Sequence, residues 1–444
     1  MSEGFSEKKV NSMLGNVQVG YRSMLYLDVT GRNDWSSTLP ADNWSYFYPS
    51  VSLSGIVSEM VQLPEQISFL KVRGSWAKVG NDTSPYQLYP IYGVSTIISP
   101  VLGSSAPSNY PLSSLNPEST QSFEAGLDLR MFNGRIGLDF TYYNSKTTNQ
   151  ILSIAMAGSS GYGSKLINAG KMASHGAEVM LSFIPIQTKD WQWDLNLNWG
   201  ANTSRCLELD PTIKRWNLGG VRIGDVVVRE GEKFGDIIGK AYVRDDAGNV
   251  KINNNGLPVF ESDKVIGNMM PDWTGSIATS LRWKDLSFGM LIDVKKGGDV
   301  VSVTDAYASK LGNSMRSLEN REGGMVVESV NFETGKPNTT AVKSQQFYET
   351  VGGPDGVAEE FLYDGTYVKM REMSLGWVLP KIWIEKSPLK GVKFSIVARD
   401  LFFIKKNTPG NPEGAFSRSD YAQAFEISSM PPTRSFGFNL NVKF

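Results

Sequence analysis

The chain has 444 residues, with 44 Lys and Arg against 45 Asp and Glu, a formal net charge of -1 and a single cysteine, Cys206. This length suits two or three soluble domains or one large barrel, so it leaves the fold class open. The balanced charge gives no support to a nucleic-acid partner, which would favour a basic excess. One cysteine excludes an internal disulfide and carries no redox implication.

No stretch of the sequence approaches the roughly 18 consecutive apolar residues of a membrane-spanning helix. The first residues, MSEGFSEKKV, lack the apolar core of a signal peptide. A secreted barrel would need such a signal, so its absence requires an explanation.

Strict alternation of apolar and polar residues is the main pattern, and it predicts strands because helical spacing fits it badly. The stretches FEAGLDLRM, RIGLDFTYY and WQWDLNLNWGA show it clearly. We predict thirteen strands, at approximately 10–20, 24–35, 48–59, 67–79, 119–132, 135–150, 171–184, 190–206, 272–283, 285–296, 366–379, 390–401 and 431–444.

Many of these strands have ten or more residues, which exceeds the mode of about five or six in soluble sheets and matches the roughly nine to eleven that cross a bilayer. Short connections such as FNGR and RWKDL alternate with long ones. The long ones lie at about 80–118, 207–271, 297–365 and 402–430. Outer-membrane barrels sort their connections in this way, so we expect turns such as Asn133-Gly134 on one rim and the long loops on the other.

The C-terminal stretch RSFGFNLNVKF alternates to the last residue. In a barrel its apolar side would meet lipid and its polar side the lumen. We therefore expect Leu195, Leu197, Phe438 and Leu440 to face lipid, and Asn196, Asn198, Asn439 and Asn441 to face the lumen. Several tryptophans fall in or beside strands, often near their ends, where an interfacial girdle would place them: Trp191, Trp193, Trp199, Trp273, Trp283, Trp377 and Trp383.

No catalytic constellation is present in the sequence, and we predict no enzyme activity, metal or cofactor. His175 has no nearby Cys or His, which favours a polar lumen or loop residue over a metal ligand. The run RDDAGN (Asp245, Asp246) lacks the spacing and the distal Glu of a calcium loop, so it is interpreted as a solvated turn.

Aromatic side chains in the first two loops form the candidate substrate site. Rings stack on the apolar faces of sugars, and peptides bind to much the same side chains. Each ring could instead anchor the membrane interface or pack a loop, so both interpretations stay open. The candidates are Trp35, Trp44, Tyr46, Tyr86 and Tyr89, with Tyr48 and Tyr92 nearby.

An ordered set of motifs along nearly the whole chain resembles the C-terminal part of SusC/RagA-family TonB-dependent outer-membrane transporters, the nutrient importers of Bacteroidetes-type bacteria. The motifs are LYLDVTGRNDWSSTLPADNWSYFYPSVSLSGIVSE, ISFLKVRGSWAKVGN, LNPESTQSFEAGLDLRMFNGRIGLDFTYYNSKTTNQIL, NAGKMASHGAEVMLSF, IGNMMPDWTGSI, DGTYVKMREMSLGWVLP and PPTRSFGFNLNVKF.

The resemblance implies a 22-stranded barrel in the bacterial outer membrane, a plug that engages the TonB complex and a SusD-like surface lipoprotein that captures oligosaccharides or oligopeptides. It also implies that the barrel-assembly machinery reads the last strand through Phe436, Phe438, Leu440, Val442 and Phe444. Because no plug or early strands are visible, residues 1–444 are expected to be a partial barrel, strands ten to twenty-two. Residues 10–20 should then pair with a strand outside this chain.

Two other interpretations remain from the sequence. A surface-associated all-β glycan-binding protein, such as a lectin or adhesin, would turn the same apolar combs toward a dry core. A non-functional fragment of a transporter gene would have no transport activity. Extraction distinguishes the first of these, because only a membrane barrel requires detergent.

Overall fold

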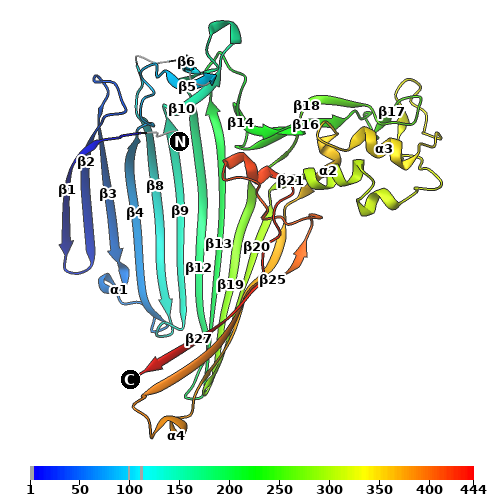
Figure 1. Cartoon of the computed structure of the whole chain (residues 1–444). Coiled ribbons are helices and arrows are strands. Elements are labelled where there is room, and N and C mark those ends of the chain that lie inside the picture. The colour runs from blue at the N-terminus through cyan, green and yellow to red at the C-terminus, as the bar shows by residue number, and fades with distance from the viewer. Residues whose placement is uncertain (1–4, 99–100, 111–113) are drawn as a thin grey trace. The chain divides into compact units, whose positions relative to one another are not determined.

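The computed structural model describes residues 5–98, 101–110 and 114–444. Its main feature is a 13-stranded sheet in which every strand follows its neighbour in chain order (Figure 1). The strands are β1 (Val10–Tyr21), β2 (Leu25–Ser36), β3 (Ser45–Ile56), β4 (Ile67–Asn81), β8 (Glu118–Met131), β9 (Ile136–Thr148), β12 (Lys171–Gln187), β13 (Trp191–Glu208), β19 (Pro271–Trp283), β20 (Leu286–Gly297), β24 (Tyr367–Val378), β25 (Gly391–Lys406) and β27 (Ser435–Lys443).

All thirteen predicted strands are therefore confirmed, most within two or three residues at each end. The third begins at Ser45 and stops at Ile56, because residues 57–60 form the short helix α1 (Val57–Met60) where a strand was expected. The twelfth continues to Lys406, well past its expected end. Two stretches of the predicted loop 80–118, residues 99–100 and 111–113, lie outside the described residues.

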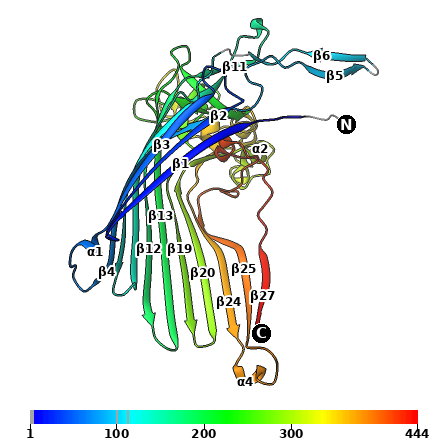
Figure 2. The ribbon, with the colours of Figure 1, turned by 90° about the vertical axis from the view of Figure 1, so that its left-hand side faces the viewer.

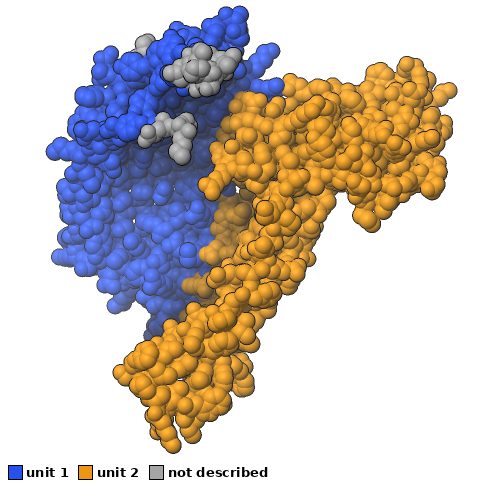
Figure 3. Space-filling model, viewed as in Figure 1, with its two compact units in different colours: residues 1–181, 202–216, 229–232 blue, residues 182–201, 217–228, 233–444 orange. Residues whose placement is uncertain are grey.

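The chain divides into two compact units (Figure 3). Unit 1 comprises residues 1–181, 202–216 and 229–232, and unit 2 comprises residues 182–201, 217–228 and 233–444. The division falls within strands β12 and β13, so each unit is described separately.

In unit 1, adjacent strands from β1 to β9 are antiparallel and lie side by side (Figure 2). The connections 22–24, 57–66 and 132–135 therefore lie at one end, and 37–44, 82–117 and 149–170 at the other. The second set is longer and holds β5 (Gly93–Ile98), β6 (Val101–Ser105), β7 (Asn109–Tyr110), β10 (Ile151–Ala155), η1 (Gly158–Ser160) and β11 (Ser164–Asn168).

In unit 2, adjacent strands of the main sheet (β13, β19, β20, β24, β25 and β27) are likewise antiparallel. The connections 188–190, 284–285 and 379–390 lie at one end, the last with helix α4 (Lys381–Ile384), and loops 298–366 and 407–434 lie at the other. Within each unit, the longest connections thus lie together at one end, as the sequence predicted.

Cross-strand register keeps each face of the sheet uniform. In unit 1, Leu27 pairs with Val19 on one side and Leu53 on the other, whereas its neighbour Asp28 pairs with Gln18 and Ser52. In unit 2, one continuous row of paired residues is apolar: Trp193, Leu281, Phe288, Leu375, Ile396 and Phe438.

The apolar face is largely exposed; for example, Leu53 is 48% exposed and Phe438 81%. A broad exposed apolar face marks a surface that meets something other than water. On the other face, Asn198 donates a hydrogen bond to Ser276 Oγ at 3.1 Å, consistent with a polar interior. The predicted alternation of Leu197 and Asn198, and of Phe438 and Asn439, is therefore present.

The hydrophobic core of the described residues lies in the long loops of unit 2, not in the main sheet. Fully buried Ile237, Val301, Val351, Phe361 and Phe425 pack together there. The elements that supply and surround this core are β14 (Arg215–Val221), β15 (Gly224–Arg229), β16 (Asp236–Tyr242), β17 (Lys251–Ile252), β18 (Phe260–Asn268), β21 (Asp299–Ser302), α2 (Val303–Lys310), η2 (Met315–Leu318), β22 (Val330–Asn331), α3 (Ser344–Val351), η3 (Ala358–Phe361), β23 (Leu362–Asp364), η4 (Asp420–Ala424) and β26 (Phe425–Glu426).

Strands β1 and β27 are the two ends of the strand order. Within the described residues β1 pairs only with β2 and β27 only with β25. No helix in the described part of the chain has the length and apolar character to span a membrane.

Candidate functional site

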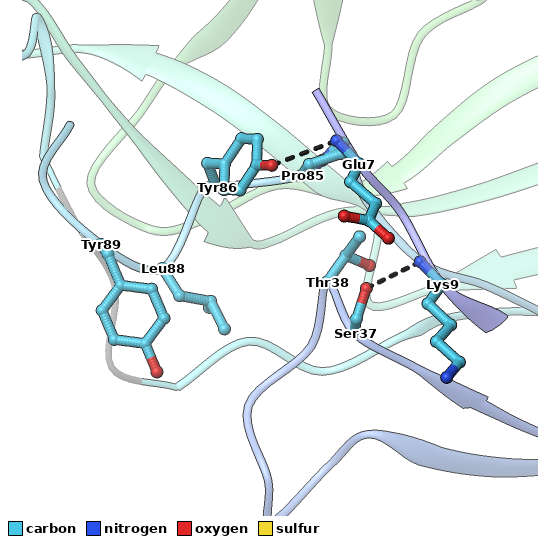
Figure 4. A pocket seen from close by; sticks show the side chains of 8 residues that line it. All are labelled: Glu7, Lys9, Ser37, Thr38, Pro85, Tyr86, Leu88 and Tyr89. Carbon is cyan, nitrogen blue, oxygen red and sulfur yellow. Dashed lines mark hydrogen bonds between the residues drawn. The ribbon is translucent and has the colours of Figure 1, made fainter. Parts of the chain in front are cut away.

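A pocket of about 470 Å³ lies among the long connections of unit 1 (Figure 4). Three segments meet there: the residues before β1, the connection from β2 to β3, and the loop that follows β4. The antiparallel pairing of Val10 with Ser36 brings the first two segments to the same end of the sheet. The pocket is lined by Glu7, Lys9, Ser37, Thr38, Pro85, Tyr86, Leu88 and Tyr89.

Backbone hydrogen bonds hold these segments together. The Lys9 N–H donates to Ser37 Oγ at 3.0 Å, and the Ser37 N–H donates to the Lys9 carbonyl at 3.0 Å. The Glu7 N–H donates to the Tyr86 hydroxyl oxygen at 3.1 Å, as Figure 4 shows. Because that hydroxyl accepts this bond, its own proton remains available to a ligand.

Asp82 anchors the same region through side-chain contacts. Its carboxylate accepts a hydrogen bond from Lys8 Nζ at 2.5 Å and another from the Ser36 hydroxyl. Burial opposes ionisation of this carboxyl, but these bonds outweigh it, so the pKa of Asp82 lies below its usual value. The ionised form therefore ties the segment before β1 to the loop after β4.

Tyr86 and Tyr89 also line a second pocket of about 300 Å³, together with Gln87 and Ile91. Their side chains are 45% and 73% exposed, so both rings present open faces. Two rings shared by neighbouring pockets suit stacking on a flat ligand surface, such as a sugar ring or a peptide side chain. The structure thus brings two of the predicted site residues together.

Tyr46 lies elsewhere, on the polar face of β3. Its ring stacks on that of Tyr48, with centroids 5.8 Å apart. A side chain at Gly80 would place its Cβ 2.5 Å from the Tyr46 ring, so the glycine leaves room for this aromatic pair. Buried Asp34 accepts hydrogen bonds from Tyr48 and, at 2.8 Å, from Arg32 Nε. Tyr46 therefore belongs to a packed polar cluster at the end of β2 and β3.

Trp35 and Trp44 belong neither to the pockets around Tyr86 nor to the polar cluster of Tyr46. Trp35 pairs with Ser45 while Asp34 pairs with Tyr46, so Trp35 lies on the opposite, apolar face of the sheet. The Trp44 side chain is 50% exposed, and its carbonyl accepts a hydrogen bond from the Ser36 N–H at 2.9 Å. A ligand on the polar face would not meet Trp35; ligand contact by any of the five residues stays a prediction.

A charged cluster that the sequence pattern did not single out lies on the polar face of unit 2. Lys369 Nζ lies 2.8 Å from Asp400 and 2.6 Å from Glu413. Arg371 forms ion pairs with Asp293, Asp400 and Glu413. Strict alternation from Leu375 would place Lys369 and Arg371 on the apolar face; the register shift between Met370 and Glu372 turns Lys369 to the polar face opposite Asp293, so the sequence pattern gave no signal for this cluster.

Glu413 comes from the loop between β25 and β27, so this cluster fastens that loop to the sheet. Lys369 is buried, with its side chain only 2% exposed, and a buried cation requires such partners. Burial opposes ionisation of Glu413, yet hydrogen bonds from Arg371 and Lys369 prevail and its pKa is lowered. Loop 407–434 is therefore held by ionised groups.

The other polar residues that the sequence analysis discussed, His175 and Asp245, lie in an exposed strand position and in a turn. His175 is an exposed residue of β12. Asp245 Oδ1 accepts hydrogen bonds from the N–H groups of Ala247 and Asn249 at 3.0 and 2.8 Å, which is the geometry of an Asx turn. The described residues contain no group of three or more His, Cys, Asp or Glu arranged to hold a metal ion.

The C-terminal strand β27 pairs antiparallel with β25. Phe438 pairs with Ile396 and Leu440 with Phe394, and the rings of Phe394 and Phe438 stack with centroids 6.4 Å apart. Phe444 follows the strand and is 76% exposed. Recognition of these side chains by an assembly machinery stays a prediction.

The family model described as "TonB dependent receptor-like, beta-barrel" matches residues 11–326. The chain is 24% identical to TonB-dependent receptor P3 of Formosa agariphila, an alignment that covers 100% of this chain and 46% of the relative. It is also 24% identical to TonB-dependent receptor SusC of Bacteroides thetaiotaomicron, covering 98% of this chain and 43% of SusC.

Among solved structures, the RagAB peptide transporter matches with a TM-score of 0.75 and 18% identity, over 99% of this chain and 48% of the matched chain. At that identity the match supports the fold alone. The chain spans about half the length of the curated relatives that it matches over its full extent.

The family model covers most of the chain, and its β-barrel is the architecture that long, two-faced, antiparallel strands produce. The sequence resemblance to SusC and RagA is confirmed by the relatives and the fold. The chain belongs to the family of TonB-dependent receptor-like β-barrels.

Proposed function

We propose that this chain forms part of the wall of a SusC/RagA-like importer in the bacterial outer membrane. The importer moves oligosaccharides or oligopeptides inward, with energy supplied through TonB, and works with a SusD-like surface lipoprotein. The observation that carries the proposal is the register of the sheet, which keeps one face apolar and exposed and the other polar, with long loops at one end of each unit. A barrel wall that separates lipid from an aqueous lumen needs this arrangement.

Closure of the wall requires further strands. In lipid, each unpaired backbone group at a sheet edge costs several kcal/mol, so β1 and β27 need partners on their outer edges. We propose that these partners lie outside residues 5–444. Hydrogen exchange in the intact transporter tests this: β2 already bonds the alternate amides of β1 that face it, so a partner would protect the outward-facing amides as well, and rapid exchange of those outward-facing amides would rule out a partner.

The pockets around Tyr86 and Tyr89 are the proposed place of first substrate contact in unit 1. Their rings, together with the carboxylate of Glu7 and the hydroxyls of Ser37 and Thr38, can stack on and hydrogen-bond either a sugar or a peptide. The likeness of the fold to that of the RagAB peptide transporter supports the peptide alternative. The proposed substrate is therefore either an oligosaccharide or an oligopeptide.

Uptake by intact cells tests the function. A strain lacking this gene, complemented with the wild type, should regain uptake of labelled oligosaccharides or of labelled oligopeptides, and collapse of the proton gradient should abolish that gain. Restoration of neither class, or uptake indifferent to the gradient, would contradict the importer. Detergent-free recovery of the protein in the soluble fraction would contradict the barrel itself.

Single-residue variants test which aromatic side chains of the pockets contact the substrate. Tyr86→Ala and Tyr89→Ala should weaken uptake at low substrate concentration by roughly 5- to 100-fold, because stacking on an aromatic ring contributes about 1–3 kcal/mol. Tyr92→Ala is the matched control, since Tyr92 lies in the same loop, is 61% exposed and lines neither pocket. Equal losses from all three variants would mean that the loop, not the pocket, matters.

A further inference from the structure

A separate pocket of about 590 Å³ lies within unit 2, between α2, η2 and the start of α3. It belongs to loop 298–366 and shares no residue with the pockets of unit 1. Small-molecule sites have volumes of about 300–1,000 Å³, so this pocket is large enough for a ligand with a body as well as a charged group. Its lining residues are Ser309, Lys310, Leu311, Gly312, Asn313, Ser317, Arg321, Lys343, Ser344, Gln345, Tyr348 and Glu349.

Three buried serines lie in this lining, and one of them has an unused hydroxyl. Ser309 Oγ donates to Asp305 Oδ1 at 3.4 Å, and Ser317 Oγ donates to the Ser314 carbonyl at 2.6 Å. Ser344 is only 1% exposed, and its Oγ has no hydrogen-bond partner among the described residues. A buried hydroxyl without a partner destabilises the fold, so a ligand that bonds it would relieve that cost.

Ser344 is also the first residue of α3. The first turn of any helix leaves backbone N–H groups without intrahelical partners, and the N-cap residue Lys343 provides no side-chain cap. These N–H groups, and the positive end of the helix dipole, favour an anion beside Ser344.

The charges of the lining favour the same kind of ligand. Lys310, Arg321 and Lys343 contribute three cations, against the single carboxylate of Glu349. Arg321 is held in place by its bonds to the carbonyls of Gly312, at 2.7 Å, and Ser317, at 3.3 Å. Glu349 accepts a hydrogen bond from Gln345 Nε2 at 2.9 Å, which gives that carboxylate a partner of its own.

We propose that this pocket binds a small oxyanion, a carboxylate or phosphate group, between the Ser344 hydroxyl, the start of α3 and the three cationic side chains. The anion is either free in solution or part of a larger acidic molecule. The inference does not depend on the proposed transport function, because it uses only contacts within unit 2.

Calorimetric titration of the detergent-solubilised full-length protein with inorganic phosphate tests the proposal, with chloride at equal ionic strength as the blank. Phosphate should bind saturably to the wild type. Lys343→Gln and Ser344→Ala should each weaken binding about tenfold, because each variant removes one hydrogen-bond donor to a charged ligand. Ser344→Ala should not impair folding, since it removes only a hydroxyl that has no partner.

Lys336→Gln is the matched control, because Lys336 lies in the same loop, is exposed and does not line the pocket. It should leave phosphate affinity unchanged. Phosphate heats no larger than the chloride blank, or equal weakening by Lys336→Gln and Lys343→Gln, would overturn the proposal. Parallel titrations with a diglutamate peptide and with glucuronate distinguish the sources: tighter binding than phosphate assigns the anion to a larger acidic molecule, and weaker binding assigns it to the free ion.

Discussion

Replacing Leu197 by Arg tests the orientation of the sheet at one position. Leu197 lies on β13 and pairs with Ile277, which pairs in turn with Ile292, so its side chain is part of the apolar face. The adjacent residue Asn198 lies on the polar face opposite Ser276. A single step along the strand therefore separates a lipid-facing position from a lumen-facing one.

The depth of Leu197 follows from the aromatic pair at the end of the strand. Trp191 stacks on Trp283 with centroids 5.6 Å apart, as expected of an interfacial girdle. Leu197 is six positions further along β13. At about 3.3 Å per residue and a tilt of about 40°, it lies about 15 Å above the girdle, near the middle of an apolar band about 25 Å tall.

An arginine at that depth on the lipid face should cost about 2–4 kcal/mol of folding free energy. The assay is guanidinium denaturation of the transporter in phospholipid vesicles, followed by tryptophan fluorescence. The matched control is Asn198→Arg, which adds the same side chain facing the lumen and should cost far less. Equal midpoints for the two variants, or no loss in Leu197→Arg, would refute the assignment of faces.

Three further outcomes are expected. Glu413→Gln should free its loop from the sheet without unfolding the barrel, at a cost of about 1–3 kcal/mol, measured as faster hydrogen exchange confined to that loop. Because the pKa of Asp82 is depressed in the folded protein, its hydrogen bond to Lys8 should stabilise the fold above the unfolded pKa near 3.8. That stabilisation should be lost as the pH falls through the lower, folded pKa. A spin label on the N-terminal segment should therefore become mobile only below pH 3.8. Phe361→Ala should cost about 3–5 kcal/mol in the loop core, so protease should cleave that loop domain while the barrel keeps its resistance to heating in SDS. Cleavage unaffected by the last change would contradict a separate core.

Many strands of the main sheet could be recognised in the sequence because they repeat a two-residue pattern, over nine positions in β13 and β27. That repeat assigned Leu197 and Asn198 to opposite faces before any partner strand was known. It also revealed the long loops, because the pattern stops there. One exception is local: the third strand ends at Ile56, and residues 57–60 form the short helix α1 instead of continuing the strand.

Only the tertiary structure showed what the long loops contain. Their strands and helices, such as β17 and η3, are too short for a periodic pattern to appear, and Phe361 and Phe425 meet in one core although they are far apart in the chain. The tertiary structure was also needed to show which residues form the candidate sites. Tyr86 and Tyr89 were recognisable as exposed rings, but their pocket depends on Glu7 and Ser37 from other segments.

The charged cluster shows the physical reason why the sequence could not predict which side chains meet. Strict alternation would place Lys369 and Arg371 on the apolar face with Leu375, but a register shift between Met370 and Glu372 turns Lys369 to the polar face. Whether they meet carboxylates depends on Asp400 across the strand pair and on Glu413 from a loop that folds back. Neighbouring residues thus determine the local backbone geometry. The partner of a side chain depends instead on long-range packing, which no short stretch of sequence specifies.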